Sequence, residues 1–385
     1  MPGPEFMAPA LFLAGIFFFN FTSRLLIAPL MPVIEEDLSL GHGAAGGLFL
    51  FITIGYFTSM AGAGFITSRI THKSTIVLSS AALGFALVAS ALSTGASGMY
   101  AGMTFVGMAA GLYLPSGIAT LTSLVDQRRW GMAVAIHELA PNMGFVIAPV
   151  ASNLLLAPLG WRGILLLTGI LALAAGILHL FFGRGGEFPG TPPNPTTINR
   201  YFSTREAWIM VVLFGLAIAG SLGIYTMLPL FLVSSHSLSM GEANTLVTLS
   251  RISGIGMTFA AGWAADRFGL RQVILAVLFA TGITSLMIGL LSGPWLTVAV
   301  FLQPAFAVSF FPAGFSALSR IGGDAQARNV AVSSTVPLGF ILGGGLVPAG
   351  IGLSGDLGAF SAGITITGAL IVAGAFLTFL LRIPR

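Results

Sequence analysis

Long apolar runs, separated by short polar or Gly- and Pro-rich breaks, occupy almost the whole sequence. Each run has 20 residues or more. That length lets a helix cross a bilayer, whereas the strands of a membrane barrel would show about ten alternating residues each. The pattern therefore predicts an all-α membrane protein with twelve transmembrane helices, at 8–33, 43–67, 74–93, 98–123, 131–156, 161–182, 206–233, 241–264, 271–291, 295–319, 328–351 and 357–381.

One long break divides the chain near its midpoint. Residues 183–205, GRGGEFPGTPPNPTTINRYFSTR, contain four prolines and few apolar residues, which is typical of a linker. We expect an N-terminal six-helix bundle over 8–182, a cytoplasmic linker over 183–205, a C-terminal six-helix bundle over 206–381 and a cytoplasmic tail over 382–385. Residues 1–7 are expected to join a cloning remnant, MPGPEF, to the native start at Met7.

Short segments of the first half recur in the second half at offsets of 197 to 200 residues. An even number of helices per half leaves both copies in the same orientation, so the two bundles are expected to be related by a pseudo-two-fold axis along the membrane normal. The matching pairs are GFITSRITHK (64–73) with GWAADRFGLR (262–271), LSLG (38–41) with LSMG (238–241), and LPSGIATL (114–121) with FPAGFSAL (311–318).

Composition agrees with a membrane protein. Of 385 residues, 56% are hydrophobic and only 7% are charged, against about 25% charged in soluble domains. The mean hydropathy is +0.97. The absence of cysteine excludes disulfides, thiolate metal sites and cysteine nucleophiles.

The basic residues predict the orientation. With the N-terminus on the cytoplasmic side, thirteen of the sixteen Lys and Arg residues fall on that side, and only Arg162 falls on the other. This asymmetry follows the positive-inside rule, so both termini are expected on the cytoplasmic side of the membrane. We expect that membrane to be a bacterial inner membrane. It also explains the isoelectric point near 10.0 without a nucleic-acid partner. The thirteen are Arg69, Lys73, Arg128, Arg129, Arg184, Arg200, Arg205, Arg267, Arg271, Arg320, Arg328, Arg382 and Arg385.

A loop signature follows the eighth apolar run. Its pattern is Gly262-x-x-x-Asp266-Arg267-x-Gly269-x-Arg271. Through this motif and the tandem repeat, the chain resembles the major facilitator superfamily of secondary transporters over essentially its whole length. The resemblance implies that Gly262, Asp266, Arg267 and Arg271 lock a cytoplasmic gate, with the glycine letting two helices touch and the aspartate pairing with arginine and a helix N-terminus.

The first half carries a degenerate copy of this signature. Gly64 and Arg69 are retained, and we assign both to the gate. Ser68 stands where the family has an aspartate, so this copy lacks the charge of the lock. In the fifth run, Gly144-FVI-Ala148-Pro149 resembles a motif associated with antiporters.

Three ionisable side chains lie well inside predicted spans: Arg24, Glu138 and Arg251. A charge at mid-bilayer costs about 2.5–3.5 kcal/mol on insertion scales, so such residues face a cavity or a partner. Arg24 and Arg251 come from opposite halves, and their guanidinium forks suit a carboxylate or another oxyanion. Helical spacing and mid-span polarity add further candidates, so the expected solute-binding set is Arg24, Arg251, Asn20, Tyr113, Asn142, Tyr225 and Gln303.

Glu138 has two interpretations. A carboxyl that burial and a nearby arginine pull in opposite directions suits a proton carrier, and His137 beside it titrates near neutrality when unperturbed. We therefore expect Glu138, with His137, to couple transport to protons. The alternatives are a structural hydrogen bond at Glu138, or an Arg24–Glu138 ion pair that only joins two helices.

These features predict a transporter that moves a small organic anion, of monocarboxylate type, by alternating access coupled to protons. The expected partners are the anionic solute, protons and the lipid bilayer, with a monomer as the working unit. The first alternative is a proton-driven exporter of hydrophobic compounds with the same fold, using Arg24 and Glu138 as its relay. The second is a membrane enzyme or sensor, but we find no nucleophile motif, metal-ligand cluster or phosphate-binding loop. We therefore expect no enzymatic activity, metal or cofactor.

Overall fold

The computed structural model describes residues 4–126, 130–192, 195–322 and 325–383. Over these ranges the chain folds into helices joined by turns, and the only pairing of β type there is an isolated bridge between Thr71 and Pro189. The described residues are thus all-α, as predicted. Several residues used above lie outside the described ranges: Arg128, Arg129 and Arg385 of the charge asymmetry, 1–3 of the expected remnant, and 193–194 of the linker.

Ten helical segments of the described residues are long and apolar enough to cross a membrane, so the protein is a multi-pass helical membrane protein. The number differs from the twelve expected runs for two reasons. Two runs were expected over 131–182, but Met132–Phe182 counts as one segment. Gly160 nevertheless breaks this segment, with φ 64° and ψ 171°. The run expected at 241–264 is helical, as α11 (Met240–Phe268), but is not among the ten.

The chain forms two compact units. The first comprises Met1–Leu30 and Ile54–Pro193, and the second comprises Met31–Thr53 and Asn194–Arg385. This division differs from the expected halves in one segment, because the end of α2 (Ile27–Asp37) and the first half of α3 (His42–Thr67) group with the second unit.

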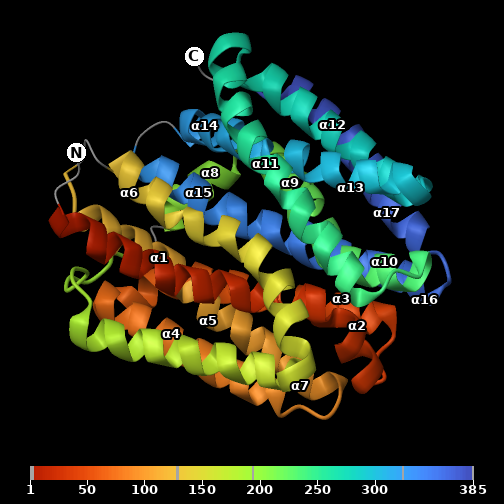
Figure 1. The fold of residues 1–385 in the computed structure, drawn as a ribbon. Helices are drawn as coiled ribbons and strands as arrows, with labels where there is room; N and C mark the ends of the chain where they lie inside the picture. Colours follow the sequence, from red (N-terminus) through yellow and green to blue (C-terminus); the bar gives the residue numbers. More distant parts are fainter. Residues whose placement is uncertain (1–3, 127–129, 193–194, 323–324, 384–385) are drawn as a thin grey trace. The chain divides into compact units, whose positions relative to one another are not determined.

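In the first unit, α4 packs against both α5 and α7, while α1 packs against α5, α6 and α7 (Figure 1). Its buried core includes Leu13, Phe17 and Tyr113. The Thr71 hydroxyl caps the start of α4 by accepting a hydrogen bond from the Ser74 backbone N–H. The helices that lie wholly in this unit are α1 (Pro4–Leu25), α4 (His72–Ala91), α5 (Ala96–Ser123), α6 (Trp130–His137) and α7 (Leu139–Phe182).

In the second unit, α12 packs against α13 and α17, α11 packs against α13, and α9 packs against α15. Phe214 and Phe310 meet edge to face in its core, with ring centroids 5.1 Å apart. Besides α11, its elements are α8 (Pro195–Phe202), α9 (Arg205–Ile218), η2 (Ala219–Gly223), α10 (Ile224–His236), α12 (Leu270–Leu290), α13 (Gly293–Val308), α14 (Phe310–Gly322), α15 (Ala325–Phe340), η3 (Ile341–Leu346), α16 (Val347–Asp356), α17 (Phe360–Ala375) and η4 (Phe376–Leu380).

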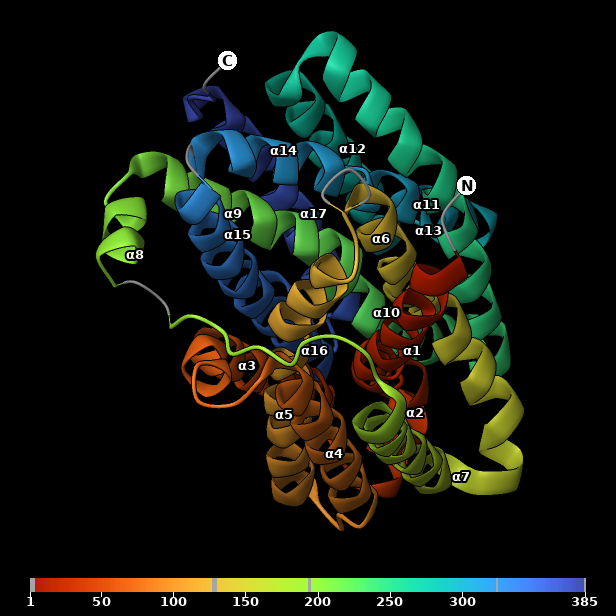
Figure 2. The same ribbon diagram turned by 90° about the vertical axis from the view of Figure 1, so that its left-hand side faces the viewer.

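The expected linker is more ordered than its composition suggests. On the side of the first unit it runs as an extended strap, visible in Figure 2, in which the carbonyls of Gly186 and Phe188 accept hydrogen bonds from Lys73 N and His72 N. On the side of the second unit it forms α8, whose Tyr201 hydroxyl lies 2.7 Å from the hydroxyl of Thr335 in α15. Burial raises the pKa of Tyr201 to about 12, so this phenol stays protonated at neutral pH.

Small residues let α3 and α16 approach closely in the second unit. A Cβ added at Gly352 would lie within van der Waals overlap of the His42 carbonyl oxygen, and one at Gly46 would overlap the Pro348 carbonyl oxygen. Asp356, at the end of α16, accepts a hydrogen bond of 3.0 Å from the Gly43 backbone N–H in the first turn of α3. This carboxylate satisfies a free amide at a helix N-terminus, where negative charge is favoured.

Candidate functional site

Arg24 lies in the last turn of α1, just before the helix is interrupted at Leu26. Its guanidinium carbon is 4.6 Å from the centroid of the Tyr56 ring and 5.0 Å from that of Phe21. Both distances are within the range of cation–π attraction. Among the described residues Arg24 makes no ion pair, and its buried Nε has no hydrogen-bond partner. Aromatic faces therefore hold this cation without cancelling its charge.

The Arg24–Glu138 ion pair, which we considered as a structural alternative, is not formed. Glu138 instead lies beside His137, and its side chain is 48% exposed. The Tyr56 phenol is nevertheless within electrostatic reach of both Arg24 and Glu138. The two charged residues thus share a neighbourhood in the first unit without neutralising each other by direct contact.

Asn20 and Asn142, both expected to bind the solute, use their side-chain amides on the protein itself. Asn20 is buried, and its Nδ2 donates a hydrogen bond of 3.3 Å to the Ala110 carbonyl. The Nδ2 of Asn142 donates a hydrogen bond of 2.9 Å to the backbone carbonyl of Glu138. In this structure the first links α1 to α5, and the second supports the start of α7.

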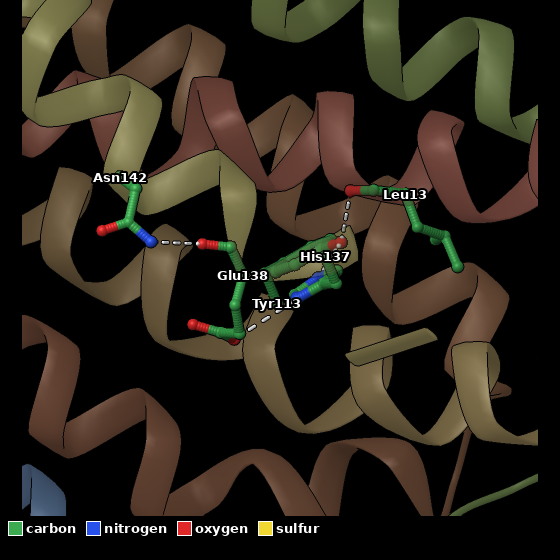
Figure 3. Close-up of polar contacts among 5 residues, drawn as sticks. All are labelled: Leu13, Tyr113, His137, Glu138 and Asn142. Atoms are coloured by element: carbon green, nitrogen blue, oxygen red, sulfur yellow. Dashed lines mark hydrogen bonds and ion pairs between the residues drawn. The ribbon is translucent and has the colours of Figure 1, made fainter. Parts of the chain in front are cut away.

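Tyr113, His137 and Glu138 form a connected polar group in the first unit (Figure 3). The Tyr113 hydroxyl donates a hydrogen bond of 2.7 Å to the Leu13 carbonyl and lies 3.0 Å from His137 Nε2. On the other side of the imidazole, Nδ1 lies 3.5 Å from Glu138 Oε1. The structure thus brings together the two expected proton-coupling residues, with Tyr113, expected to bind solute, directly attached to them.

A helix break positions this group. α6 ends at His137 and α7 begins at Leu139, so Glu138 stands at the junction. Pro141 lacks the N–H that would bond the His137 carbonyl four residues earlier, which weakens the helix at this point. The break separates a fully buried His137 from a half-exposed Glu138 in adjacent positions.

Arg251 lies in α11 with 8% of its surface exposed. Its Nη2 donates a hydrogen bond of 2.8 Å to the Ser221 carbonyl, and its guanidinium carbon lies 4.2 Å from the centroid of the Tyr225 ring. Tyr225 is itself buried in α10. A carbonyl dipole and a ring face thus orient this arginine, as two ring faces orient Arg24.

The acceptor for Arg251 comes from an irregular segment. Residues Ala219–Gly223 form a π-helix, a local widening that frequently marks functional sites. Besides the Ser221 carbonyl, the Gly220 carbonyl of this segment accepts a hydrogen bond of 2.8 Å from Gln303 Nε2. Arg251 and Gln303, both predicted from the sequence, are therefore tied to the same turn of η2.

Tyr56 and the carbonyls of η2 were missed by the sequence analysis. Tyr56 lies in an apolar run, where a single tyrosine carries no spacing signal. Its contact with Arg24 depends on the position of another helix, which the sequence does not show. For η2 the sequence offers only Gly220 and Gly223, and glycines are common in membrane helices.

The predicted gate residues are exposed or partly exposed. In the part of the chain that is described, Asp266 makes no ion pair, and a Cβ at Gly262 would meet no atom within 4 Å. Arg267 lies over Trp263, while Arg271 Nη2 donates a 2.5 Å hydrogen bond to the Phe379 carbonyl. Among the described residues no ion pair of the implied lock is present, and the gate assignments, with Gly64 and Arg69, stay predictions.

Comparison with known proteins decides the family. The sequence profile described as Major Facilitator Superfamily matches residues 13–260, which is more than half of the chain. The chain belongs to the Major Facilitator Superfamily. The resemblance inferred from the loop signature and the repeat is thereby confirmed.

Two relatives of this superfamily member are named for organic acids. It is 29% identical over 320 residues to monocarboxylate transporter 11 of Homo sapiens, covering 77% of this chain and 65% of the relative. It is 23% identical over 370 residues to a gallate transporter of Pseudomonas putida, covering 84% of this chain and 81% of that relative. A transporter of Mycobacterium tuberculosis is 22% identical over 69% of this chain and 49% of the relative. The chain thus spans about two-thirds and half of the human and mycobacterial proteins.

Solved structures of the superfamily share the fold. A bacterial homologue of the human lysosomal transporter Spinster, in an inward-facing and occupied conformation, superposes with a TM-score of 0.83 at 15% identity, covering 99% of this chain and 97% of that chain. The nucleoside transporter NupG gives a TM-score of 0.76 at 15% identity, with 98% of each chain covered. At such identities the likeness shows the fold alone.

Proposed function

We propose that this superfamily member is a secondary transporter that carries a small organic anion of monocarboxylate type. The observation that supports it most is the set of groups that surround the two arginines of the predicted spans. Arg24 rests on aromatic faces without a carboxylate partner among the described residues, and Arg251 is oriented by a neutral carbonyl and a tyrosine ring. The names of the human and Pseudomonas relatives agree with an organic-acid cargo.

The proposed architecture has twelve spans in two six-helix bundles related by a pseudo-two-fold along the membrane normal, with both termini cytoplasmic. The protein works as a monomer and alternates between inward- and outward-open states. A solute shifts that equilibrium only through a difference in its affinity for the two states.

Guanidinium chemistry favours a carboxylate as the recognised group. Each fork can donate two parallel hydrogen bonds to one carboxylate, and its charge persists at every physiological pH. Arg24 and Arg251 come from the two predicted bundles, and in this proposal each binds the anionic group. With two arginines proposed to bind the solute, an anionic solute is favoured over a cationic one.

Protons enter the proposal through Glu138 and His137. In this proposal the half-exposed carboxyl exchanges protons with water from the solute pathway, and the buried imidazole lies 3.5 Å from it. Protonation of this pair would offset the negative charge that the solute brings into the site, which links the two binding events.

The proton-driven exporter is the second candidate, because the Gly144-FVI-Ala148-Pro149 segment resembles an antiporter motif. Its relay needs Arg24 and Glu138 in contact, and these side chains form no ion pair in this structure.

A thermal-shift screen tests the solute class directly. Purified protein is heated with monocarboxylates, phosphate, inorganic oxyanions or cationic drugs, at pH 6 and pH 8. A ligand at about 100 times its Kd stabilises the folded state by about 2.7 kcal/mol, which raises the apparent Tm by a measurable amount. We expect monocarboxylates to stabilise the protein, more strongly at pH 6. Stabilisation by cationic drugs alone would contradict the proposal and favour the exporter.

A further inference from the structure

His137 is enclosed in a stack of rings. Its imidazole lies nearly parallel to the Phe17 ring, with centroids 4.4 Å apart and an interplanar angle of 10°, and nearly parallel to the Tyr113 ring, with an angle of 3°. All three side chains are buried, His137 completely. The plane of the imidazole ring is therefore fixed. Its Nε2 edge faces Tyr113, and its Nδ1 edge faces Glu138.

The hydrogen bonds around Tyr113 determine where the proton of a neutral His137 resides. A phenol has one hydrogen, and Tyr113 uses it on the Leu13 carbonyl, which can only accept. The 3.0 Å contact between the Tyr113 oxygen and His137 Nε2 must then be donated by the imidazole. A neutral His137 is therefore protonated at Nε2, and Nδ1 carries the lone pair.

Nδ1 is the nitrogen that faces Glu138. It is buried, and among the described residues it has no hydrogen-bond partner, since Glu138 Oε1 at 3.5 Å is beyond an effective bond. An unfilled acceptor next to a half-exposed carboxyl is the arrangement needed to receive a proton.

We propose that Tyr113 is a positioning residue that holds His137 in the Nε2–H tautomer, so that Nδ1 and Glu138 Oε1 form the proton site of this transporter. In the step, a hydronium ion gives its proton to the Glu138 carboxylate and becomes water, after which the Oε1–H bond breaks and an Nδ1–H bond forms. The result is an imidazolium beside a carboxylate, with the positive ring stacked on Phe17, where a cation is favoured. This inference rests on the proton coupling of the proposed function and deepens it.

The surroundings contain few other titratable groups. Among the described residues, Tyr113 from α5 faces the imidazole, and α1 contributes Phe17 and the Leu13 carbonyl, which do not titrate. The Tyr56 ring, 4.6 Å from the Arg24 guanidinium carbon, is a further titratable side chain of the first unit. The sequence analysis assigned Tyr113 to the solute, whereas this proposal uses its hydroxyl on His137.

Nitrogen NMR of the full-length protein labelled with ¹⁵N-histidine tests the inference, because protonated and unprotonated imidazole nitrogens have well-separated shifts. His137→Gln identifies the signals of His137. At alkaline pH we expect wild-type His137 to be protonated at Nε2 alone. We expect Tyr113→Phe, which keeps the ring but removes the oxygen, to give a mixture of tautomers. Tyr100→Phe, in the same helix, is the matched control and should retain the wild-type signals.

A second readout is the pH profile of solute uptake in proteoliposomes. A charged N–H donor loses more than a neutral one when its acceptor is removed, so Tyr113→Phe should move the midpoint of the profile to lower pH by about half a unit or more. A wild-type His137 protonated at Nδ1, or a Tyr113→Phe protein with unchanged tautomer and unchanged profile, would overturn the inference. If the wild type moves no organic anion, the proposed function fails, while the nitrogen spectra still decide the tautomer.

Discussion

A tyrosine ring lies under each arginine of the proposed solute site. Arg24 is 4.6 Å from the Tyr56 centroid, and Arg251 is 4.2 Å from that of Tyr225. The sequence revealed both arginines, because a charge inside an apolar run is energetically costly and therefore indicates a functional residue. It did not reveal Tyr56, since that ring reaches Arg24 from another helix. For Tyr225 the sequence suggested a hydroxyl contact with the solute, whereas the structure shows its ring face against Arg251.

Substitutions at Tyr225 separate the ring from the hydroxyl. Tyr225→Phe keeps the face under Arg251 and should leave anion affinity within about twofold of the wild type. Tyr225→Leu removes the cation–π contact, worth about 1 kcal/mol, and should weaken affinity roughly fivefold. Thermal-shift titration with a stabilising monocarboxylate measures both. Equal losses in the two variants would mean that the hydroxyl is what matters.

Glu138→Gln tests the proton site at the residue scale. The amide resembles the carboxylate in shape but takes up no proton, so uptake driven by an imposed pH gradient should fall at least tenfold. Counterflow, in which labelled solute enters against unlabelled solute inside the vesicle, needs no net proton movement and should persist. Proteoliposomes loaded with and without unlabelled solute give both rates. Gradient-driven uptake at the wild-type rate would leave Glu138 as a structural hydrogen-bonding residue only.

At the scale of helices, interruptions place the chemistry. The break between α6 and α7 puts Glu138 at a junction, and Pro141 makes this break understandable from the sequence. The π-helix η2 supplies the carbonyls that hold Arg251 and Gln303, yet its composition is ordinary for a membrane helix. Pro141 thus accounts for one interruption, although other prolines, such as Pro115 and Pro149, lie inside continuous helices. The π-segment has no comparable signal in its own sequence.

The close approach of α3 and α16 makes a prediction about stability. Gly352→Ala places a Cβ against the His42 carbonyl oxygen, and overpacking of this kind costs about 1–3 kcal/mol. The apparent Tm of the purified protein should fall by several degrees. Gly350→Ala is the matched control in the same helix, because a Cβ there meets nothing within 4 Å. It should leave the Tm unchanged or raise it, since alanine favours helix over glycine. The same Tm in both variants would contradict this helix contact.

For the whole molecule, hydropathy predicted a multi-pass helical protein, and the resemblance carried by the loop signature and the internal repeat predicted the superfamily. They were less informative about segment boundaries. Residues 131–182 were expected as two runs, and Gly160 does break this stretch with φ 64° and ψ 171°, but the further break between α6 and α7 was not expected. The linker was predicted from its prolines, but α8 and the strap hydrogen bonds depend on surfaces far away in the sequence.

Single cysteines test the orientation proposed for the whole chain, because the protein has none of its own. Thr94 and Ser203 are exposed in the connections on opposite predicted sides. A membrane-impermeant maleimide applied to intact cells should label Thr94→Cys and leave Ser203→Cys unlabelled until the cells are opened. Labelling of Ser203→Cys in intact cells would reverse the assignment of both termini.

The central claim is that two arginines bind the anionic group of the solute, and counterflow of radiolabelled lactate and benzoate into proteoliposomes tests it most directly. Arg24→Lys and Arg251→Lys keep the charge but lose the fork, so each should lower saturable uptake at least tenfold, the equivalent of about 1.4 kcal/mol. Arg320→Lys, at an exposed site in α14, should transport as the wild type does. Saturable uptake at the wild-type rate in Arg251→Ala would contradict the account.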